Sequence, residues 1–266
     1  MQKKDNSKEN FRFAKNIFLE QNNNKKNIIS NSDDLCEYSY NLFPELNKKN
    51  IVGIIGSDEV GTGDVFGPIV VCTALITKKQ IPFLRKIGIK DSKKLSKNKI
   101  KKIYELIKDK ILHQVQILTP SEYNLLNKTN NLNKIKALCH NLAIINILKK
   151  IKDKNVIVVM DQFASSSLYF NYLNKEKEIY KEIIFETKAE SKYLSVTLAS
   201  IIARYFFLQE IENISKMLGV EICLGADHKV NEQIIDIHNK HNFDIFLQIS
   251  KCNFKNIKNN IIKNDK

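Results

Sequence analysis

Two adjacent acids, Asp58 and Glu59, are the residues most suited to chemistry. They follow the apolar run at 51–55 and come just before a glycine-rich turn at 61–63. Neighbouring residues on a strand point to opposite faces, so the two acids cannot both be ordinary solvent residues if the strand is central. A Gly-x-Gly turn lets the backbone approach a phosphate, and carboxylates beside a phosphate need a divalent cation between them. The segment therefore indicates a magnesium-type site that acts on a phosphodiester.

Two further acids follow later elements. Asp161 ends the continuous apolar run at 155–160, and Glu190 precedes a helix with small residues. A run that is apolar on both faces predicts a strand in the middle of an α/β sheet, and ligands of such sheets collect at strand ends. Four carboxylates there would hold two divalent ions about 3.5–4 Å apart for phosphodiester cleavage. Each later acid alone is more often a turn or helix-cap residue, so the inference depends on the whole set.

The elements that must position these acids follow from periodicity and capping. Apolar, β-branched runs predict strands at 51–55, 69–76, 155–160 and 183–185. Helical spacing predicts helices over 97–112, 132–151 and 195–218, with Ser96 as the N-cap of the first. His140 lies on the apolar side of the second helix, where we expect a satisfied core histidine, and His228 has no assigned role.

The chain divides by composition into three parts. We expect a polar, Lys- and Asn-rich extension at 1–50, a folded α/β domain at 51–250 and a basic, frayed tail at 251–266. The whole chain has 266 residues and 43% hydrophobic residues, enough for one domain with extensions. Its formal net charge of +14 favours a polyanionic partner, although the abundance of Lys, Asn and Ile also fits a general composition bias.

Several protein classes are disfavoured. Five scattered cysteines without a CxxC pair indicate neither a zinc site nor a disulfide framework, and reduced thiols fit a cytoplasmic protein. We find no run of about 18 apolar residues and no apolar stretch typical of a signal peptide, so no membrane partner is expected. The absence of GxxxxGK[ST] argues against a P-loop nucleotide site.

The segment at 56–68 resembles the signature of the type 2 ribonucleases H, and of ribonuclease HIII in particular. It reads Gly56-Ser57-Asp58-Glu59-Val60-Gly61-Thr62-Gly63-Asp64-Val65-Phe66-Gly67-Pro68. Thr62 between two glycines is similar to the HIII form, whereas the HII form usually carries arginine there. Further segments agree in order at 90–96, 123–133, 160–163 and 187–204, and the resemblance covers roughly 51 to 245.

The resemblance implies a ribonuclease H-like α/β fold, with a mixed β-sheet flanked by helices. It implies endonucleolytic cleavage of the RNA strand of RNA–DNA hybrids, leaving 5′-phosphate and 3′-hydroxyl ends. The family's four catalytic, metal-binding positions, which hold two Mg²⁺ or Mn²⁺ ions, fall on Asp58, Glu59, Asp161 and Glu190. The loop that contacts RNA 2′-hydroxyls falls on Gly61, Thr62 and Gly63. Further candidates for contacts to backbone phosphates are Lys90, Ser92, Lys188 and Lys192.

One departure from the family lies at the N-terminus, and two alternative functions stay open. Ribonuclease HIII usually carries a folded TBP-like N-terminal domain, for which residues 1–50 are too few and too polar. The lysines along 1–50 and at the C-terminus would act instead as a diffuse electrostatic grip. The first alternative is HII-like incision at single ribonucleotides embedded in duplex DNA, against which Thr62 argues. The second is a non-catalytic hybrid-binding protein, against which the complete acid set argues. We expect a monomer.

Overall fold

A five-stranded mixed sheet forms the centre of the computed structural model, which describes residues 51–87, 89 and 95–262. The strand order is β3-β2-β1-β4-β5. The strands are β1 (Gly53–Val60), β2 (Ile69–Ile76), β3 (His113–Leu118), β4 (Val156–Asp161) and β5 (Ile183–Glu186). Pairing is antiparallel among β1, β2 and β3, and parallel from β1 to β4 and from β4 to β5. The mixed sheet and its flanking helices match the predicted fold class.

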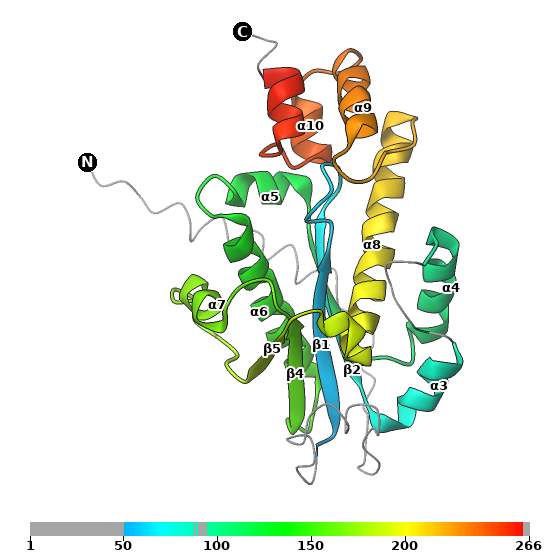
Figure 1. Cartoon of the computed structure of the whole chain (residues 1–266), viewed down its shortest axis with the longest axis vertical. Helices are drawn as coiled ribbons and strands as arrows, with labels where there is room; N and C mark the ends of the chain where they lie inside the picture. Colours follow the sequence, from blue (N-terminus) through cyan, green and yellow to red (C-terminus); the bar gives the residue numbers. More distant parts are fainter. Residues whose placement is uncertain (1–50, 88, 90–94, 263–266) are drawn as a thin grey trace, which may run out of the picture.

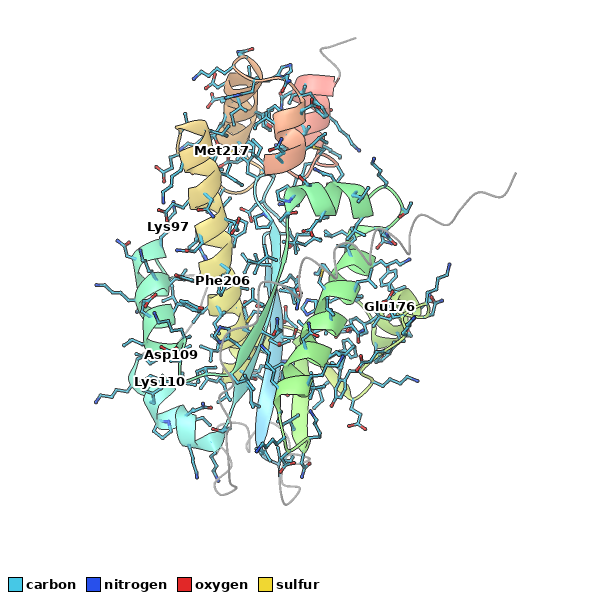
Figure 2. All side chains as sticks on the ribbon, turned by 180° about the vertical axis from the view of Figure 1, so that it is seen from behind. Lys97, Asp109, Lys110, Glu176, Phe206 and Met217 are labelled. Carbon is cyan, nitrogen blue, oxygen red and sulfur yellow. The ribbon has the colours of Figure 1, made fainter. Side chains whose placement is uncertain are left out.

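Two long helices cover the two faces of this sheet (Figure 1): α6 (Leu132–Lys150) on one face and α8 (Leu194–Leu218) on the other. The shorter helices are α3 (Ile81–Lys86), α4 (Lys97–Ile107), α5 (Pro120–Leu126), α7 (Ser166–Tyr172), α9 (His228–His238), α10 (Asp244–Ile249) and α11 (Lys255–Ile257). Irregular helical turns are η2 (Lys78–Gln80), η4 (Ala189–Ser191) and η5 (Lys258–Ile262). Seen from behind in Figure 2, α4 runs along α8, where Phe206 contacts the ring of Tyr104 edge to face at 5.3 Å.

Strand β2 shows why both faces need cover. Every residue from Ile69 to Ile76 is buried. Cys72 and Ala74 belong to the apolar cluster under α8, whereas Ile69 and Val71 belong to a cluster under α6. Successive side chains thus enter opposite cores, as the pleat of a strand requires.

Gly56 lets α8 lie directly on β1. A Cβ on Gly56 would stand 2.2 Å from the backbone of Ser195 and Val196, so any side chain would push the helix away. Ala199 and Ala203 are fully buried on the same helix. By length and hydropathy α8 could cross a membrane, contrary to our expectation of no such run, but 61% of its apolar window is buried, as in a core helix of a soluble protein.

Several predicted elements are confirmed and some boundaries are wrong. The strand at 69–76 is confirmed, and Ser96 caps α4 by accepting a hydrogen bond from the N–H of Lys99. The first strand is longer than the predicted 51–55, so Asp58 and Glu59 lie inside β1 rather than after it. Helix α4 ends at Ile107, before the predicted 112, and the sequence analysis did not find β3.

The frayed C-terminal tail predicted from Lys251 is wrong for residues 251–262. Lys251 itself is fully buried, and Ile257 and Ile261 belong to the core cluster under α8. The β1–β2 hairpin extends toward this C-terminal part, where α9 and α10 lie beyond the end of the sheet (Figure 1). The composition was misleading because its apolar residues are sparse but spaced for burial, as at 257 and 261.

Candidate active site

Asp58 and Asp161 lie next to each other on neighbouring parallel strands. The last registered pair of β1 and β4 is Ser57 with Met160, so the two aspartates are the next residues along each strand. Residues that pair across parallel strands share a face, and here this is the α8 face, because Asp58 is hydrogen-bonded to the side chain of Ser200. The structure therefore brings the two predicted acids together at the end of β4.

Glu190 reaches the same region through a short turn. The N–H of Ala189 donates to Asp161 Oδ1 at 2.7 Å, which ties η4 to the end of β4. The hydroxyl of Thr197, on α8, donates to the backbone oxygen of Glu190 at 2.6 Å. Lys188, at the start of the turn, has φ of 54° and is the one non-glycine residue of the described part with a positive φ. Such backbone conformations are costly and cluster at functional sites.

Glu59 points to the opposite face, toward α6. Its Oε2 accepts a hydrogen bond from His140 Nε2 at 2.9 Å, and its Oε1 forms an ion pair with Lys136. His140 Nδ1 lies 2.7 Å from the hydroxyl of Ser57. Because an ionised carboxylate can only accept, Nε2 of His140 carries a hydrogen. Both oxygens of Glu59 are thus held by the chain itself.

The electrostatic surroundings of the adjacent acids differ. The pKa of Asp58 is raised well above its usual value, first by burial, then by the charge of Glu59, with a smaller contribution from Asp161. Burial also acts to raise the pKa of Glu59, but the hydrogen bond and charge of His140 and the charge of Lys136 outweigh it and lower that pKa. The charge of Glu59 is therefore balanced by its partners, whereas the charges that act on Asp58 are negative.

The donor set fits a divalent cation, although the side chains do not yet enclose one. Within the described residues, no group of three His, Cys, Asp or Glu side chains could hold a metal ion as they lie. Glu59 is turned toward α6, where His140 and Lys136 hold its oxygens. The fit comes from chemistry: carboxylate oxygens are the ligands that Mg²⁺ and Mn²⁺ prefer, and the charges that act on Asp58 come from Glu59 and Asp161, both negative.

The candidate substrate contacts are only partly gathered around these acids. Gly61 is buried, Thr62 is half-buried and Gly63 is exposed, in the loop that follows β1. Lys188 is exposed beside η4, whereas Lys192 forms an ion pair with Glu186 at the end of β5. Lys90 and Ser92 lie outside the described residues.

Sequence reasoning missed one partner of the site and undervalued another. His140 is a satisfied, fully buried histidine, as expected, but it bonds to a candidate catalytic acid. Lys136 was not singled out at all, yet it is buried, pairs with Glu59 and lies 4.0 Å from the centre of the Phe163 ring. The available signal was spacing, because a lysine and a histidine four residues apart share one face of a helix. His228 is exposed and lies 3.4 Å from Glu232.

Comparison with known proteins follows this geometry. The family model for ribonuclease HII matches residues 55–257. Ribonuclease HIII from Phytoplasma mali (strain AT) is 52% identical over 211 residues, which cover 79% of this chain and 73% of that protein. The chain belongs to the ribonuclease HII family, in its HIII branch. Ribonuclease HIII from Listeria monocytogenes serotype 4b (strain CLIP80459) is 41% identical, with 76% of this chain and 67% of that protein covered.

Solved structures agree with this family assignment. Bst-RNase HIII in complex with Mn²⁺ is similar with a TM-score of 0.77 and 32% identity, covering 89% of this chain and 76% of that one. Ribonuclease H2 from Pyrococcus horikoshii OT3 is similar with a TM-score of 0.65 and 25% identity, covering 80% of this chain and 99% of that one. The resemblance stated from the sequence, to type 2 ribonucleases H and to HIII in particular, is confirmed.

Proposed function

We propose that this protein is an endonuclease that hydrolyses the RNA strand of RNA–DNA hybrids with divalent metal ions, leaving 5′-phosphate and 3′-hydroxyl ends. The observation that carries the proposal is the side-by-side position of Asp58 and Asp161, with Asp161 tied to the turn that bears Glu190. Family membership supports the reaction class, and the Mn²⁺ complex of Bst-RNase HIII supports the metal.

Different groups of the chain hold these acids in position. We propose Asp58, Glu59, Asp161 and Glu190 as ligands of two Mg²⁺ or Mn²⁺ ions, which when bound supply an activated water and offset the charge on the phosphate. Ser200 orients Asp58, the N–H of Ala189 orients Asp161, and Thr197 fixes the backbone of Glu190. Because these groups are held by α8 and η4, the acids keep their places while a substrate exchanges.

The loop and the nearby lysines are proposed as the substrate contacts. Gly61, Thr62 and Gly63 would meet the RNA 2′-hydroxyls, which distinguish RNA from DNA at a given site. Lys188, which is exposed next to η4, would hold a backbone phosphate, and Lys192 would do so while paired with Glu186. Lys90 and Ser92 remain candidates from the sequence.

Cleavage of a labelled RNA–DNA hybrid with Mg²⁺ or Mn²⁺ tests the proposal. We expect cutting that EDTA abolishes and that Asp161→Asn abolishes without unfolding the protein. Asp236→Asn is the matched control, because Asp236 is an exposed acid on α9, far along the chain from the site. Normal cleavage by Asp161→Asn would refute the assignment, and hybrid binding without any cleavage would favour the non-catalytic alternative.

HII-like incision at a single embedded ribonucleotide is the second candidate. The matching family model is that of ribonuclease HII, whereas Thr62 and the relatives named ribonuclease HIII favour the hybrid. The same assay with one ribonucleotide in a DNA duplex separates them, since incision there would assign the HII-like role.

The remaining properties of the protein are proposed on less direct grounds. We keep the division into a polar extension at 1–50, a catalytic domain at 51–250 and a basic segment at 251–266, although residues 251–262 pack onto the domain. A cytoplasmic location is supported by free cysteines at 72, 139, 223 and 252. A monomer remains our expectation, which sedimentation would test.

A further inference from the structure

The loop between β1 and β2 has a buried base and an open tip. Gly61 has φ of 95°, and a Cβ there would stand 2.2 Å from the backbone oxygen of Pro68, so the two ends of the loop touch. Gly63, at the tip, is exposed, and a Cβ there would meet nothing within 4 Å. The fold does not require a glycine at 63, so the tip is the part that a ligand can approach. The base decides where the tip stands.

Two segments distant in sequence hold this base by backbone hydrogen bonds. The N–H of Val65 donates to the oxygen of Gly225 at 2.9 Å. From the C-terminal side, the N–H of Gly67 donates to the oxygen of Ile249 at 2.8 Å, and the N–H of Lys251 donates to the oxygen of Val65 at 2.9 Å. The C-terminal segment therefore runs beside the loop as a short antiparallel bridge, which includes Phe66.

Lys251 adds a side-chain bond to the same place. Its Nζ donates to the oxygen of Gly67 at 2.6 Å and lies 3.5 Å from the oxygen of Phe66. The residue is fully buried, and burial lowers the pKa of Lys251 to about 7, against the opposing effect of Asp64. A lysine is rarely buried without a partner because removing its charge from water is costly. Here the amine bonds to the backbone of the loop.

We propose that Lys251 is a positioning residue for hybrid binding: its amine fixes the base of the 61–68 loop so that the tip at Thr62 and Gly63 is presented to the RNA strand. The inference rests on the proposed function of that tip. Lys251 does not touch the acids and plays no part in metal binding, so its loss acts on the substrate rather than on the metal.

Kinetics of Lys251→Met separate these effects. At saturating Mn²⁺, we expect the KM for a labelled hybrid to rise about tenfold, the scale of one lost buried hydrogen bond, with a smaller change in kcat. Mn²⁺ affinity, measured by titration calorimetry, should stay unchanged. Lys216→Met, at an exposed lysine on α8, should behave as the parent does. A KM equal to that of the parent, or a parallel loss of Mn²⁺ affinity, would overturn the positioning role.

Amide hydrogen exchange gives a readout that does not need activity. In Lys251→Met, the amides of residues 61–67 should exchange faster, whereas those of β4 should not. If the parent cuts no hybrid, the proposed function fails, and exchange still decides whether Lys251 holds the loop; unchanged exchange would refute it. Should Lys251→Met fail to fold, Lys251→Gln carries the same measurements, since its polar side chain is one atom shorter and no longer brings an amine to the oxygen of Gly67.

Discussion

Lys136→Met tests whether the chain itself balances the charge of Glu59. The Lys136 and Glu59 side chains are only 9% and 12% exposed, so methionine would leave a buried carboxylate without its cation. Removing one partner of a buried pair costs about 3–5 kcal/mol. An upper limit comes from protonation: neutralising a glutamate of ordinary pKa at pH 7 costs about 4 kcal/mol. We therefore expect a loss of about 3–4 kcal/mol in the free energy of unfolding.

Thermal unfolding in EDTA at pH 7 measures this loss. For a domain of this size, about 3–4 kcal/mol corresponds to a drop in Tm of roughly 6–15 °C. Lys149→Met is the matched control, because Lys149 also lies on α6 but pairs with Glu178 at the surface, where the side chains are 60% and 59% exposed. Exposed pairs contribute about 0–1 kcal/mol, so the control should lose little.

The direction of the Glu59 pKa shift predicts how the stability difference between the parent and Lys136→Met changes with pH. In the parent, the pKa of Glu59 is lowered in the folded state, so its contribution to stability is present above the unfolded pKa and is lost as pH falls through the folded value. In Lys136→Met the lysine no longer offsets burial, so the pKa of Glu59 should rise and its carboxyl should take up a proton as pH falls from 7; the difference in stability should therefore shrink between pH 7 and pH 4. Mn²⁺ should restore more of the Tm in Lys136→Met than in the parent. Equal losses in Lys136→Met and Lys149→Met would refute the reasoning.

Two other perturbations test the packing and the buried amine. Gly56→Ala should lower the free energy of unfolding, measured with denaturant, by about 3 kcal/mol, because its Cβ would stand 2.2 Å from the α8 backbone. Gly63→Ala is the control: its Cβ would meet nothing within 4 Å, so the change should stay within about 0.5 kcal/mol. Similar losses in the two variants would contradict the close approach of α8 to β1. Lys251, with a folded pKa of about 7 and an ordinary unfolded pKa, binds fewer protons folded than unfolded between those values. Its contribution to stability should therefore rise with pH from about 7 to 10, by up to about 1.4 kcal/mol per unit, so Lys251→Met should lose more at pH 9 than at pH 7; a constant difference would argue against a neutral buried amine.

Local sequence patterns predicted the sheet centre and the β5 edge, but not the β3 edge. The strand at 69–76 and the acid at the end of β4 could be predicted because continuous apolar runs indicate strands buried on both faces. Strand β3 could not, since Gln114 and Gln116 occupy its buried face, where apolar residues are the usual signal. The end of β1 was predicted too early because the polar residues Ser57, Asp58 and Glu59 are more typical of a turn than of a central strand.

The candidate acids were predicted from the sequence, but their partners were not. Asp58 and Asp161 lie side by side because β1 and β4 are parallel neighbours in the sheet. Local sequence patterns do not predict the order of strands in a sheet. Lys136 and the roles of His140 and Lys251 depend on which helix or segment packs over which residue. From the sequence alone, a lysine is expected at the surface, even when it lies on the buried face of a helix. Only the position of its buried partner shows otherwise.

The adjacency of Asp58 and Glu59 determines how the site must work. One residue apart on β1, they face α8 and α6, so a single ligand cannot meet both from one side of the strand. Asp58 shares its face with Asp161, and the negative charges of Glu59 and Asp161 act on it, which favours a cation there. Glu59 is already paired with Lys136 and His140, so joining the same cation requires it to share or exchange those partners. If Glu59 is a metal ligand as proposed, Lys136 and His140 set the cost of bringing its carboxylate to the metal, and α6 then contributes to the site although the predicted acids lie elsewhere.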